Sequence, residues 1–513
     1  MLIKCLMLTV FFAVMIGIGL YCRSHAADVK GFVLGGRSVG PWLTAFAYGT
    51  SYFSAVIFVG YAGQFGWKYG IASTWIGIGN ALIGSMLAWI VLGRRTRIMS
   101  QYLDSATMPE FFGQRFQSRP LKIGASLIIF LFLIPYTASL YNGLSRLFSM
   151  AFSIDYTICI VLMAVFTGIY VIAGGYMATA INDFIQGIIM LIGIAAVIAA
   201  VLCSKGGFMN ALQDLAAVED ASVSSSPGVF ASFFGPDPLS LLSVILLTSL
   251  GTWGLPQMVQ KFYAIRSETA IQTGMIVSTV FALIVAGGCY FLGGFGRLFS
   301  ESIDVAVNGY DSIIPTMLSD LPDVLIALVI ILVLSASMST LSSLVIASSS
   351  TLTIDVIKDN IVADMSEKKQ LTCIRFLIVV FIAVSVVIAI IQYKGNLSFI
   401  AQLMGISWGA LAGSFLAPFL FALYWRKTSL TACWTCFIFG SGVMIANMLF
   451  PQLFPPLLQS PINAGAFVML AGFVIVPVVS LLTPKPDPIF IRHAFACYEK
   501  KVEAAQKLTL GGK

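Results

Sequence analysis

Apolar stretches of about twenty residues recur along the whole of this sequence, and almost none of them contains a charged side chain. Such stretches are long enough to cross the hydrocarbon core of a membrane as α-helices. Of the residues, 58% are hydrophobic and only 10% are charged, whereas a soluble chain carries about 25% charged residues. The sequence therefore predicts an all-α polytopic membrane protein that is surrounded by membrane lipid.

Thirteen transmembrane helices are expected from these stretches. Their approximate bounds are residues 5–22, 41–65, 71–93, 122–145, 155–174, 180–203, 239–258, 271–296, 324–354, 373–392, 398–424, 430–450 and 462–483. If the N-terminus lies outside, 23 of the 29 Lys and Arg residues lie in cytoplasmic segments, as the positive-inside rule requires. We therefore expect a multi-pass protein of the plasma (inner) membrane with a cytoplasmic C-terminus. The first stretch is taken as a span rather than a cleaved signal peptide, because its removal would invert this bias.

Several function classes are disfavoured by the sequence. The net charge of +7 does not indicate a nucleic-acid partner, because the long outer loops at 204–238 and 297–323 are not basic. No nucleophile–base pair and no His/carboxylate metal set indicates an enzyme. About thirty residues follow the last span, too few for a fused kinase domain. A channel stays open as a function class. A saturable flux without unitary currents would indicate a carrier instead.

Two predicted spans are interrupted near their centres. The first carries the polar run GTSYFS (49–54), and the second carries GTWGLP (251–256). Small residues at such places either let helices pack closely or mark unwound segments whose free carbonyls bind a cation. The second interrupted span lies five spans after the first, which is the pattern of an inverted repeat of two five-span units. This correspondence favours the unwound segments.

Asp183 is a carboxylate left well inside a predicted span. A charged side chain in a span normally faces a cavity or a partner. Alternatively, Asp183 lies near the start of its helix and is stabilised by the helix dipole. No Lys or Arg lies within a predicted span to pair with it, and we therefore expect a bound cation as its partner.

Hydroxyl side chains crowd the run SASMSTLSSL (335–344) within an apolar span. Ser339, Ser342 and Ser343 are spaced at i, i+3 and i+4 and share one face of a helix, with Ala336 and Thr340 beside them. Hydroxyl and carbonyl oxygens are hard, neutral ligands suited to a monovalent alkali cation, whereas a divalent ion would need more carboxylates. Hydrogen bonding to the preceding helical turn or to a neighbouring helix is the alternative.

Together these motifs resemble the sodium:solute symporter family, whose members share a leucine-transporter-type core. The resemblance covers roughly residues 30–430. Its most specific parts are GGRSVGPW (35–42), GGYMATAINDFIQG (174–187), GTWGLPQMVQKF (251–262) and SASMSTLSS (335–343). The resemblance implies Na⁺-coupled symport of a small organic solute into the cell by alternating access. The expected partners are the solute, Na⁺ and lipid, and we expect a functional monomer.

The resemblance also implies cation sites at matching positions. The first Na⁺ site would comprise Thr50, Phe53, Ala336, Ser339 and Thr340. Some members of the family carry a second Na⁺ site, and its matching residues here are Asp183, Ser339, Ser342 and Ser343. A stoichiometry above one Na⁺ per solute follows as an expectation.

The solute is expected midway through the membrane, beside the interrupted spans. The candidate binding residues are Tyr48, Ser51, Tyr52, Ser54, Tyr136, Thr248, Thr252, Trp253 and Trp408. Ile57 stands where sugar-transporting members carry a glutamine, and Tyr52 stands where proline-transporting members carry an aspartate. The run SYFSAVIFVGYAGQFGWKYG (51–70) is more similar to members that move pantothenate and other carboxylates. The order of expected solutes is therefore a small carboxylate or pantothenate-like acid, then an amino acid of the proline type, then a sugar.

The predicted organisation divides the chain into six parts. These are an extra helix and loop at 1–38, a first repeat at 39–205, an extracellular loop at 206–238, a second repeat at 239–427, two additional helices at 428–483 and a cytoplasmic tail at 484–513.

Overall fold

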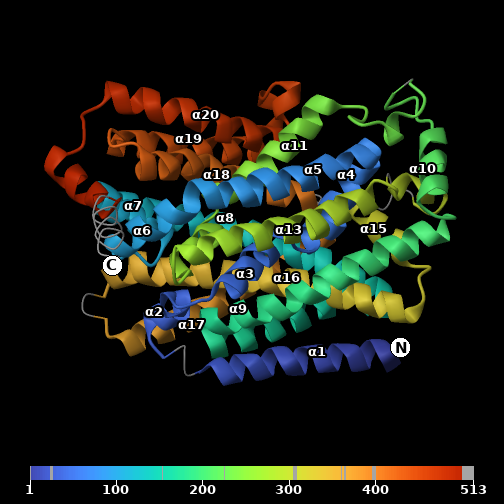
Figure 1. Cartoon of the computed structure of the whole chain (residues 1–513), viewed down its shortest axis with the longest axis horizontal. Helices are drawn as coiled ribbons and strands as arrows, with labels where there is room; N and C mark the ends of the chain where they lie inside the picture. The colour runs from blue at the N-terminus through green and yellow to red at the C-terminus, as the bar shows by residue number, and fades with distance from the viewer. Residues whose placement is uncertain are drawn as a thin grey trace, which may run out of the picture.

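The computed structural model describes residues 2–23, 27–152, 154–224, 226–303, 305, 309–359, 361–362, 365–395 and 400–498. In these ranges the chain is helical and forms no β-sheet, as the sequence predicted. Ten helical stretches are long and apolar enough to cross a membrane, or eleven if one bent pair counts as a single span. Figure 1 shows the long helices lying side by side along one common direction.

The long helices form the body of the molecule. Their bounds are α1 (Leu2–Tyr21), α3 (Pro41–Tyr52), α8 (Arg119–Phe152), α9 (Tyr156–Ser204), α11 (Pro238–Leu250), α13 (Thr269–Gly293), α16 (Asp323–Thr351), α17 (Glu367–Gly395), α18 (Ile400–Tyr424), α19 (Leu430–Leu449) and α20 (Pro461–Leu482). Shorter helices connect them: α2 (Val29–Leu34), α4 (Ala62–Tyr69), α5 (Thr74–Gly79), α6 (Arg94–Tyr102), α7 (Met108–Phe116), α10 (Phe208–Ala217), α12 (Pro256–Ala264) and α15 (Ile313–Leu318).

Two helical runs are much longer than one membrane crossing. They extend over Val56–Tyr102 and Tyr156–Ser204, with 47 and 49 residues, whereas about 20 residues suffice for one crossing. The first run includes the π-helices η3 (Val56–Tyr61) and η5 (Asn80–Leu87). Each run contains one glycine with positive φ, Gly70 at +63° and Gly175 at +56°. A side chain at Gly70 would also overlap the backbone of Phe230. The runs change direction at these glycines, and the count of thirteen crossings stays a prediction.

Both predicted helix interruptions are present. Helix α3 ends where Phe53 adopts an extended conformation (φ −100°, ψ 132°), and helical structure resumes at Ala55. Helix α11 continues into the short 3₁₀ turn η8 (Gly251–Gly254), Leu255 is extended, and Pro256 starts α12. The axes of the two halves differ by 48°. Proline suits the first turn of a helix because its missing N–H would have no partner there.

The interruption of the first span does not begin at its glycine. Gly49 lies inside α3, and a Cβ atom there would come within 2.5 Å of the Phe281 ring on α13. Gly49 therefore permits close packing of α3 on α13, and the helix opens four residues later.

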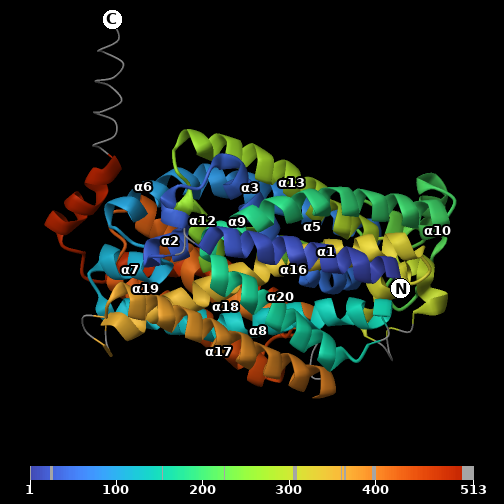
Figure 2. The same cartoon turned by 90° about the horizontal axis from the view of Figure 1, so that it is seen from below.

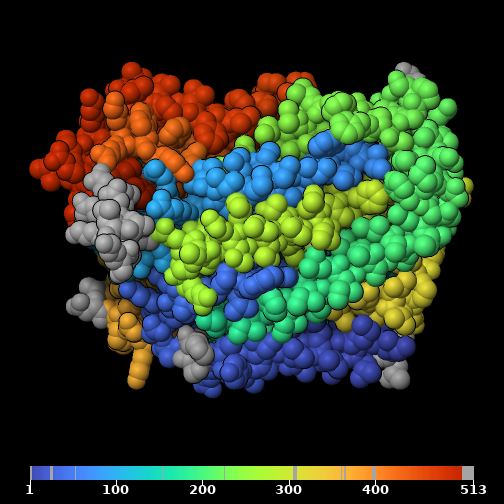
Figure 3. All heavy atoms as spheres, viewed as in Figure 1, coloured from blue at the N-terminus to red at the C-terminus, as the bar shows by residue number. Residues whose placement is uncertain are grey.

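Helices α16 and α18 form the interior of the bundle. In their most apolar segments 83% and 89% of the residues are buried, against 28% in α1 and 39% in both α19 and α20. Helix α16 packs against α9, α8, α17 and α1, and Figure 2 shows α1, α9 and α17 on the outside of this group. The face shown in Figure 3 includes α1, α9, α13, the run Val56–Tyr102 and the C-terminal helices α19 and α20. Large apolar side chains stay exposed on the outer helices, including Val10, Ile192 and Leu283. Such a belt is suited to lipid rather than to water.

Candidate functional site

The interrupted end of α3 meets the hydroxyl-rich part of α16 deep in the bundle. The end of a helix leaves its last carbonyl groups without intrahelical partners. Here the carbonyls of Thr50, Ser51 and Phe53 point toward α16 at the turn where Ser339 and Thr340 lie. All of these residues are buried.

The five residues predicted for the first Na⁺ site lie together. Ser339 Oγ is 3.1 Å from the Thr50 carbonyl oxygen and 3.0 Å from that of Ala336. Thr340 Oγ1 is 3.2 Å from the Phe53 carbonyl oxygen, 3.1 Å from that of Ala336 and 3.5 Å from that of Thr50. The structure thus brings two hydroxyls of α16 and the carbonyls of two helices into one cluster.

This cluster contains more acceptors than donors. Thr340 Oγ1 alone has four carbonyl oxygens within 3.5 Å, because the Ser51 carbonyl also lies 3.4 Å away. Each hydroxyl has a single proton to donate. The C-terminal end of α3 adds the negative end of its helix dipole. An alkali cation is the kind of group that satisfies such a surplus of neutral oxygens.

Ser337 belongs to the hydroxyl-rich run but to neither predicted Na⁺ site, and the structure gives it a hydrogen-bond partner. The backbone N–H of Ala55 donates to Ser337 Oγ at 3.3 Å. Ala55 is the first residue of the resumed helix, where N–H groups lack intrahelical partners. Ser337 therefore holds the second half of the interrupted span against α16. Ser335 Oγ is buried and forms no hydrogen bond within the described residues.

Asp183 does have a basic partner, and the expectation that no Lys or Arg lies in a span is wrong. The predicted span ended at residue 258, but α12 continues to Ala264 and carries Lys261 inside the bundle. Lys261 Nζ lies 3.9 Å from Asp183 Oδ2, and both side chains are 1% exposed. The sequence places Lys261 beyond the predicted span because a charged side chain normally lies outside an apolar stretch. The structure shows that the helix carries this charge into the bundle.

The serines predicted for the second Na⁺ site are also engaged. Lys261 Nζ donates to Ser343 Oγ at 3.0 Å. Ser343 Oγ in turn lies 2.9 Å from Ser51 Oγ on α3. Ser342 Oγ donates to the Ser339 carbonyl at 2.9 Å. The four predicted residues are neighbours, but an ammonium group stands among them.

The predicted solute-binding residues fall into two groups. The first group contacts the π-helix η5. Tyr48 Oη donates to the Gly84 carbonyl at 2.8 Å, Thr252 Oγ1 is 3.2 Å from the same oxygen, and Trp253 Nε1 donates to Ile83 at 3.0 Å. Thr248 Oγ1 is 2.8 Å from Asn80 Oδ1. These four side chains connect α3, α11 and η8 to η5.

The second group lies beside the interruption of the first span. The rings of Tyr136 on α8 and Trp408 on α18 pack edge to face, with centroids 5.8 Å apart. Ser54 lies in the interruption itself, directly after Phe53. Ser51 belongs to this group through its place on α3. The backbone of Tyr52 is the last turn of α3, but its side chain lies outside the part of the chain that the structure describes.

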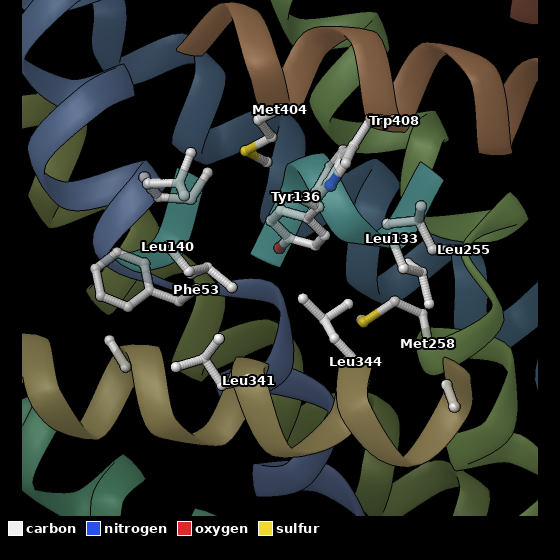
Figure 4. Close-up of a cluster of buried hydrophobic side chains, with 14 of the residues drawn as sticks. Phe53, Leu133, Tyr136, Leu140, Leu255, Met258, Leu341, Leu344, Met404 and Trp408 are labelled. Atoms are coloured by element: carbon white, nitrogen blue, oxygen red, sulfur yellow. The ribbon is translucent and has the colours of Figure 1, made fainter. Parts of the chain in front are cut away.

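Apolar side chains surround this second group. Figure 4 shows Tyr136 and Trp408 above α16, with Leu133, Leu344 and Met258 next to them and Phe53, Leu140 and Leu341 on the other side. Three buried polar side chains near the two interruptions have no hydrogen-bond partner among the described residues: Ser54, Tyr136 and Gln257. Apolar side chains with a few polar groups among them are the usual lining of a small-molecule site, and here they form a buried cluster.

Gln257 was not predicted from the sequence. It follows the proline of α12, and both atoms of its buried side-chain amide are without a partner in the described structure. The signal that could have identified it was its place directly after the GTWGLP interruption, where a half-helix begins.

Comparison with known proteins gives a relationship consistent with this geometry. The sequence model described as "Sodium:solute symporter family" matches residues 32–440, most of the chain. This chain belongs to the sodium:solute symporter family. It is a multi-pass Na⁺-coupled solute symporter, as the sequence resemblance implied.

Relatives and solved structures cover almost all of this symporter. The "Sodium/proline symporter" of Staphylococcus aureus (strain JH9) is 29% identical over 495 residues, 94% of this chain and 93% of that protein. A structure described as a substrate-bound outward-open state of a Na⁺-coupled sialic acid symporter has a TM-score of 0.71 at 15% identity, covering 94% of this chain and 99% of that chain. A manganese transporter of Eremococcus coleocola has a TM-score of 0.52 at 13% identity, and the match covers 91% of this chain and 96% of that chain. At these identities the two structures establish a shared fold.

Proposed function

We propose that this symporter binds Na⁺ between the interrupted end of α3 and the hydroxyls of α16 and uses it to move a small carboxylate-bearing solute into the cell. The observation that carries the site is the cluster of carbonyl oxygens around Ser339 and Thr340, in which acceptors outnumber protons. The ligands would be Thr50, Phe53, Ala336, Ser339 and Thr340.

Coupling follows from the two elements that the ion joins. Na⁺ at this place would tie α3 to α16 and favour the state that accepts solute from outside. Solute binding would close the outer side, and inward opening would expose the ion to low cytoplasmic sodium. A ligand shifts such an equilibrium only by its different affinity for the two states. One Na⁺ crossing 100 mV gains about 2.3 kcal/mol, which supports roughly a fifty-fold solute gradient.

The solute would lie between Tyr136, Trp408 and the two interrupted helices. Apolar walls and the unsatisfied hydroxyls of Ser54 and Tyr136 suit a compact solute with an apolar body. The N-terminal end of α12 begins directly after the second interruption, and a helix N-terminus attracts a carboxylate. Gln257 on this turn could donate a further hydrogen bond.

An amino acid of the proline type is the second candidate solute. It is favoured by the relative named as a sodium/proline symporter, which aligns over nearly the whole chain. Both candidates share a carboxylate and differ in the amino group. A sugar is the third candidate.

We also propose the number of membrane crossings and the side of the membrane on which each terminus lies. Thirteen crossings result if three conditions hold: the bent pair Pro238–Gly254 and Pro256–Ala264 is one span, α3 forms one crossing with the part of Val56–Tyr102 before Gly70 and the part after Gly70 forms another, and Tyr156–Ser204 crosses twice. The N-terminus would then lie outside and the C-terminus in the cytoplasm, with inverted repeats at 39–205 and 239–427. Labelling of single introduced cysteines from each side of the membrane would test this topology.

Counterflow in proteoliposomes tests the solute. The labelled panel would contain small carboxylic acids including pantothenate, amino acids including proline, and sugars, each with Na⁺ and with choline in its place. We expect exchange of one carboxylate class only, and only with Na⁺. Exchange of a sugar alone would contradict the proposal. Gln257→Leu should raise the half-saturating solute concentration about tenfold while leaving sodium binding unchanged.

A further inference from the structure

Lys261 is held inside the bundle rather than extended to the membrane surface. Lysines near the ends of membrane helices usually reach outward to water with their flexible side chains. Lys261 is instead 1% exposed, and its Nζ donates to Ser343 Oγ at 3.0 Å. The same ammonium lies 5.0 Å from the centre of the Tyr176 ring. Three helices, α9, α12 and α16, therefore enclose this charge.

The negative charge of the buried Asp183 carboxylate is compensated by Lys261. Neither carboxylate oxygen of Asp183 accepts a hydrogen bond from any described residue. The only ion pair that the structure gives this side chain, within the described ranges, is the 3.9 Å contact with Lys261. A buried carboxylate without a nearby positive charge would be strongly disfavoured, and so would a buried ammonium without an acceptor. Each group makes the burial of the other tolerable.

The ammonium also uses one of the oxygens that a second Na⁺ would require. Ser343 Oγ accepts the Lys261 hydrogen bond, and Ser342 Oγ donates to the Ser339 carbonyl. A sodium ion coordinated by Asp183 and Ser343 would stand next to a fixed positive charge in a medium of low dielectric. The sodium ion and the Lys261 ammonium would repel each other strongly, because a medium of low dielectric screens their charges only weakly.

We propose that the Lys261 ammonium is a built-in cation that takes the place of a second Na⁺ in this chain. The symporter would then bind a single Na⁺, at the cluster around Ser339 and Thr340. This inference rests on the proposed function only in that it assumes this first site.

The built-in cation would also link the two interrupted helices. Lys261 belongs to α12, the second half of one of them. Its partner Ser343 is 2.9 Å from Ser51 Oγ, which lies on α3 just before the other interruption. The chain Asp183, Lys261, Ser343, Ser51 thus connects α9, α12, α16 and α3. A bound second ion would supply this connection only when sodium is present, whereas a lysine supplies it permanently.

Equilibrium binding of radioactive sodium to the purified protein in lipid nanodiscs tests the inference. The wild type should bind one Na⁺ per chain with a Hill coefficient of one. Lys261→Met removes the charge and keeps the length of the side chain, and it should bind two Na⁺ with a Hill coefficient above one. Lys261→Arg keeps the charge and should bind one. Lys261→Met combined with Asp183→Asn should return to one, because the uncompensated carboxylate is gone.

Three results would overturn the inference. The first is a wild-type stoichiometry of two, a measurement that needs no variant. The second is a loss of bound Na⁺ on Asp183→Asn alone. The third is a stoichiometry of one for both Lys261→Met and Lys261→Gln in protein that elutes as a folded monodisperse species. The double variant Ser339→Ala with Thr340→Ala tests the first site separately. If it keeps wild-type sodium binding, the first site is wrong. The number of Na⁺ bound by the Lys261 variants would still be measured independently.

Discussion

At the scale of single residues, the structure shows that hydroxyls of the run 335–344 on α16 have different partners. Its serines and its threonine form three different kinds of contact. Ser339 and Thr340 face the carbonyls of α3, Ser337 accepts from the resumed helix at Ala55, and Ser343 accepts from Lys261. A helix face spaced at i, i+3 and i+4 predicted that some of these would act together, but not which neighbour each would meet.

The first residue-scale prediction concerns the sodium cluster. Ser339→Ala with Thr340→Ala removes two of the five proposed ligands without adding bulk. Hydrogen bonds and ligands to a charge are worth about 1.5–3 kcal/mol each, so the loss of two should raise the half-saturating sodium concentration by at least about a hundredfold. Radioactive sodium binding measures this directly. Ser335→Ala is the matched control on the same helix, because Ser335 contacts none of these oxygens, and it should bind sodium as the wild type does.

At the scale of elements, the interruption in the second span depends on close packing against α18. A Cβ atom at Gly254 would come within 2.8 Å of the Ala412 Cα atom and 2.9 Å of the Leu416 backbone nitrogen. Backbone atoms cannot move aside as side chains do. The short turn η8 can therefore approach α18 only if this position has no side chain.

Gly254→Ala should separate η8 from α18 and destabilise the folded protein by about 1–3 kcal/mol. The thermal unfolding midpoint in detergent measures this change. Gly442→Ala in α19 is the control, because nothing lies within 4 Å of the added carbon; it should be neutral or stabilising by about 0.5–1 kcal/mol. Equal midpoints for both variants would contradict the packing argument.

The loop between α9 and α11 is fastened to the bundle by a polar contact. Arg297 Nη1 donates to Asp220 Oδ2 at 2.9 Å, and the guanidinium lies 3.8 Å from the centre of the Phe230 ring. The Ser222 hydroxyl and the Arg297 guanidinium lower the pKa of Asp220 from its ordinary value. Arg297 Nε also donates to the Trp67 carbonyl on α4, so the loop is held near the α4 end of the first interrupted span.

Stability should depend on pH through this contact. Because the pKa of Asp220 is lower in the folded protein, its contribution is present above about pH 4 and is lost as pH falls through the folded-state value. Asp220→Asn should lower stability by less than about 1 kcal/mol at pH 7, and its difference from the wild type should vanish in acid. Unfolding midpoints recorded from pH 7 downward test this, with Asp214→Asn in the exposed part of α10 as the control.

At the scale of the whole molecule, the two halves of the chain are joined at the end that carries α2, α6 and α7 (Figure 1). Arg37 donates to the Ser105 carbonyl at 2.7 Å and to the Tyr263 carbonyl at 3.2 Å, so one guanidinium links the loop after α6 with α12. Arg97 adds contacts to the carbonyls of Ile265 and Arg266. In the proposed orientation this is the cytoplasmic end, and these contacts keep it closed.

Arg37→Ala should loosen this closure. Loss of these hydrogen bonds should lower the local opening free energy by about 1–3 kcal/mol, and amide hydrogen exchange at the end of α12 and around Ser105 should become about ten- to a hundredfold faster. Arg37→Lys should restore part of the protection, since a single ammonium cannot make the same forked contacts. Unchanged exchange in Arg37→Ala would show that other contacts close this end.

The sequence by itself determined the membrane class, the helical fold and the two interruptions. These follow from hydrophobic length and from glycine and proline positions, which are local properties of the chain. The five residues proposed for the sodium cluster came from the resemblance to the family, and the structure brings them together. Tertiary structure alone decided that α12 continues far enough to place Lys261 beside Asp183. It also decided that Tyr48, Thr248, Thr252 and Trp253 bind to η5. The physical reason is that a buried charge or hydroxyl is defined by its partner, and these partners lie on helices far away in the sequence.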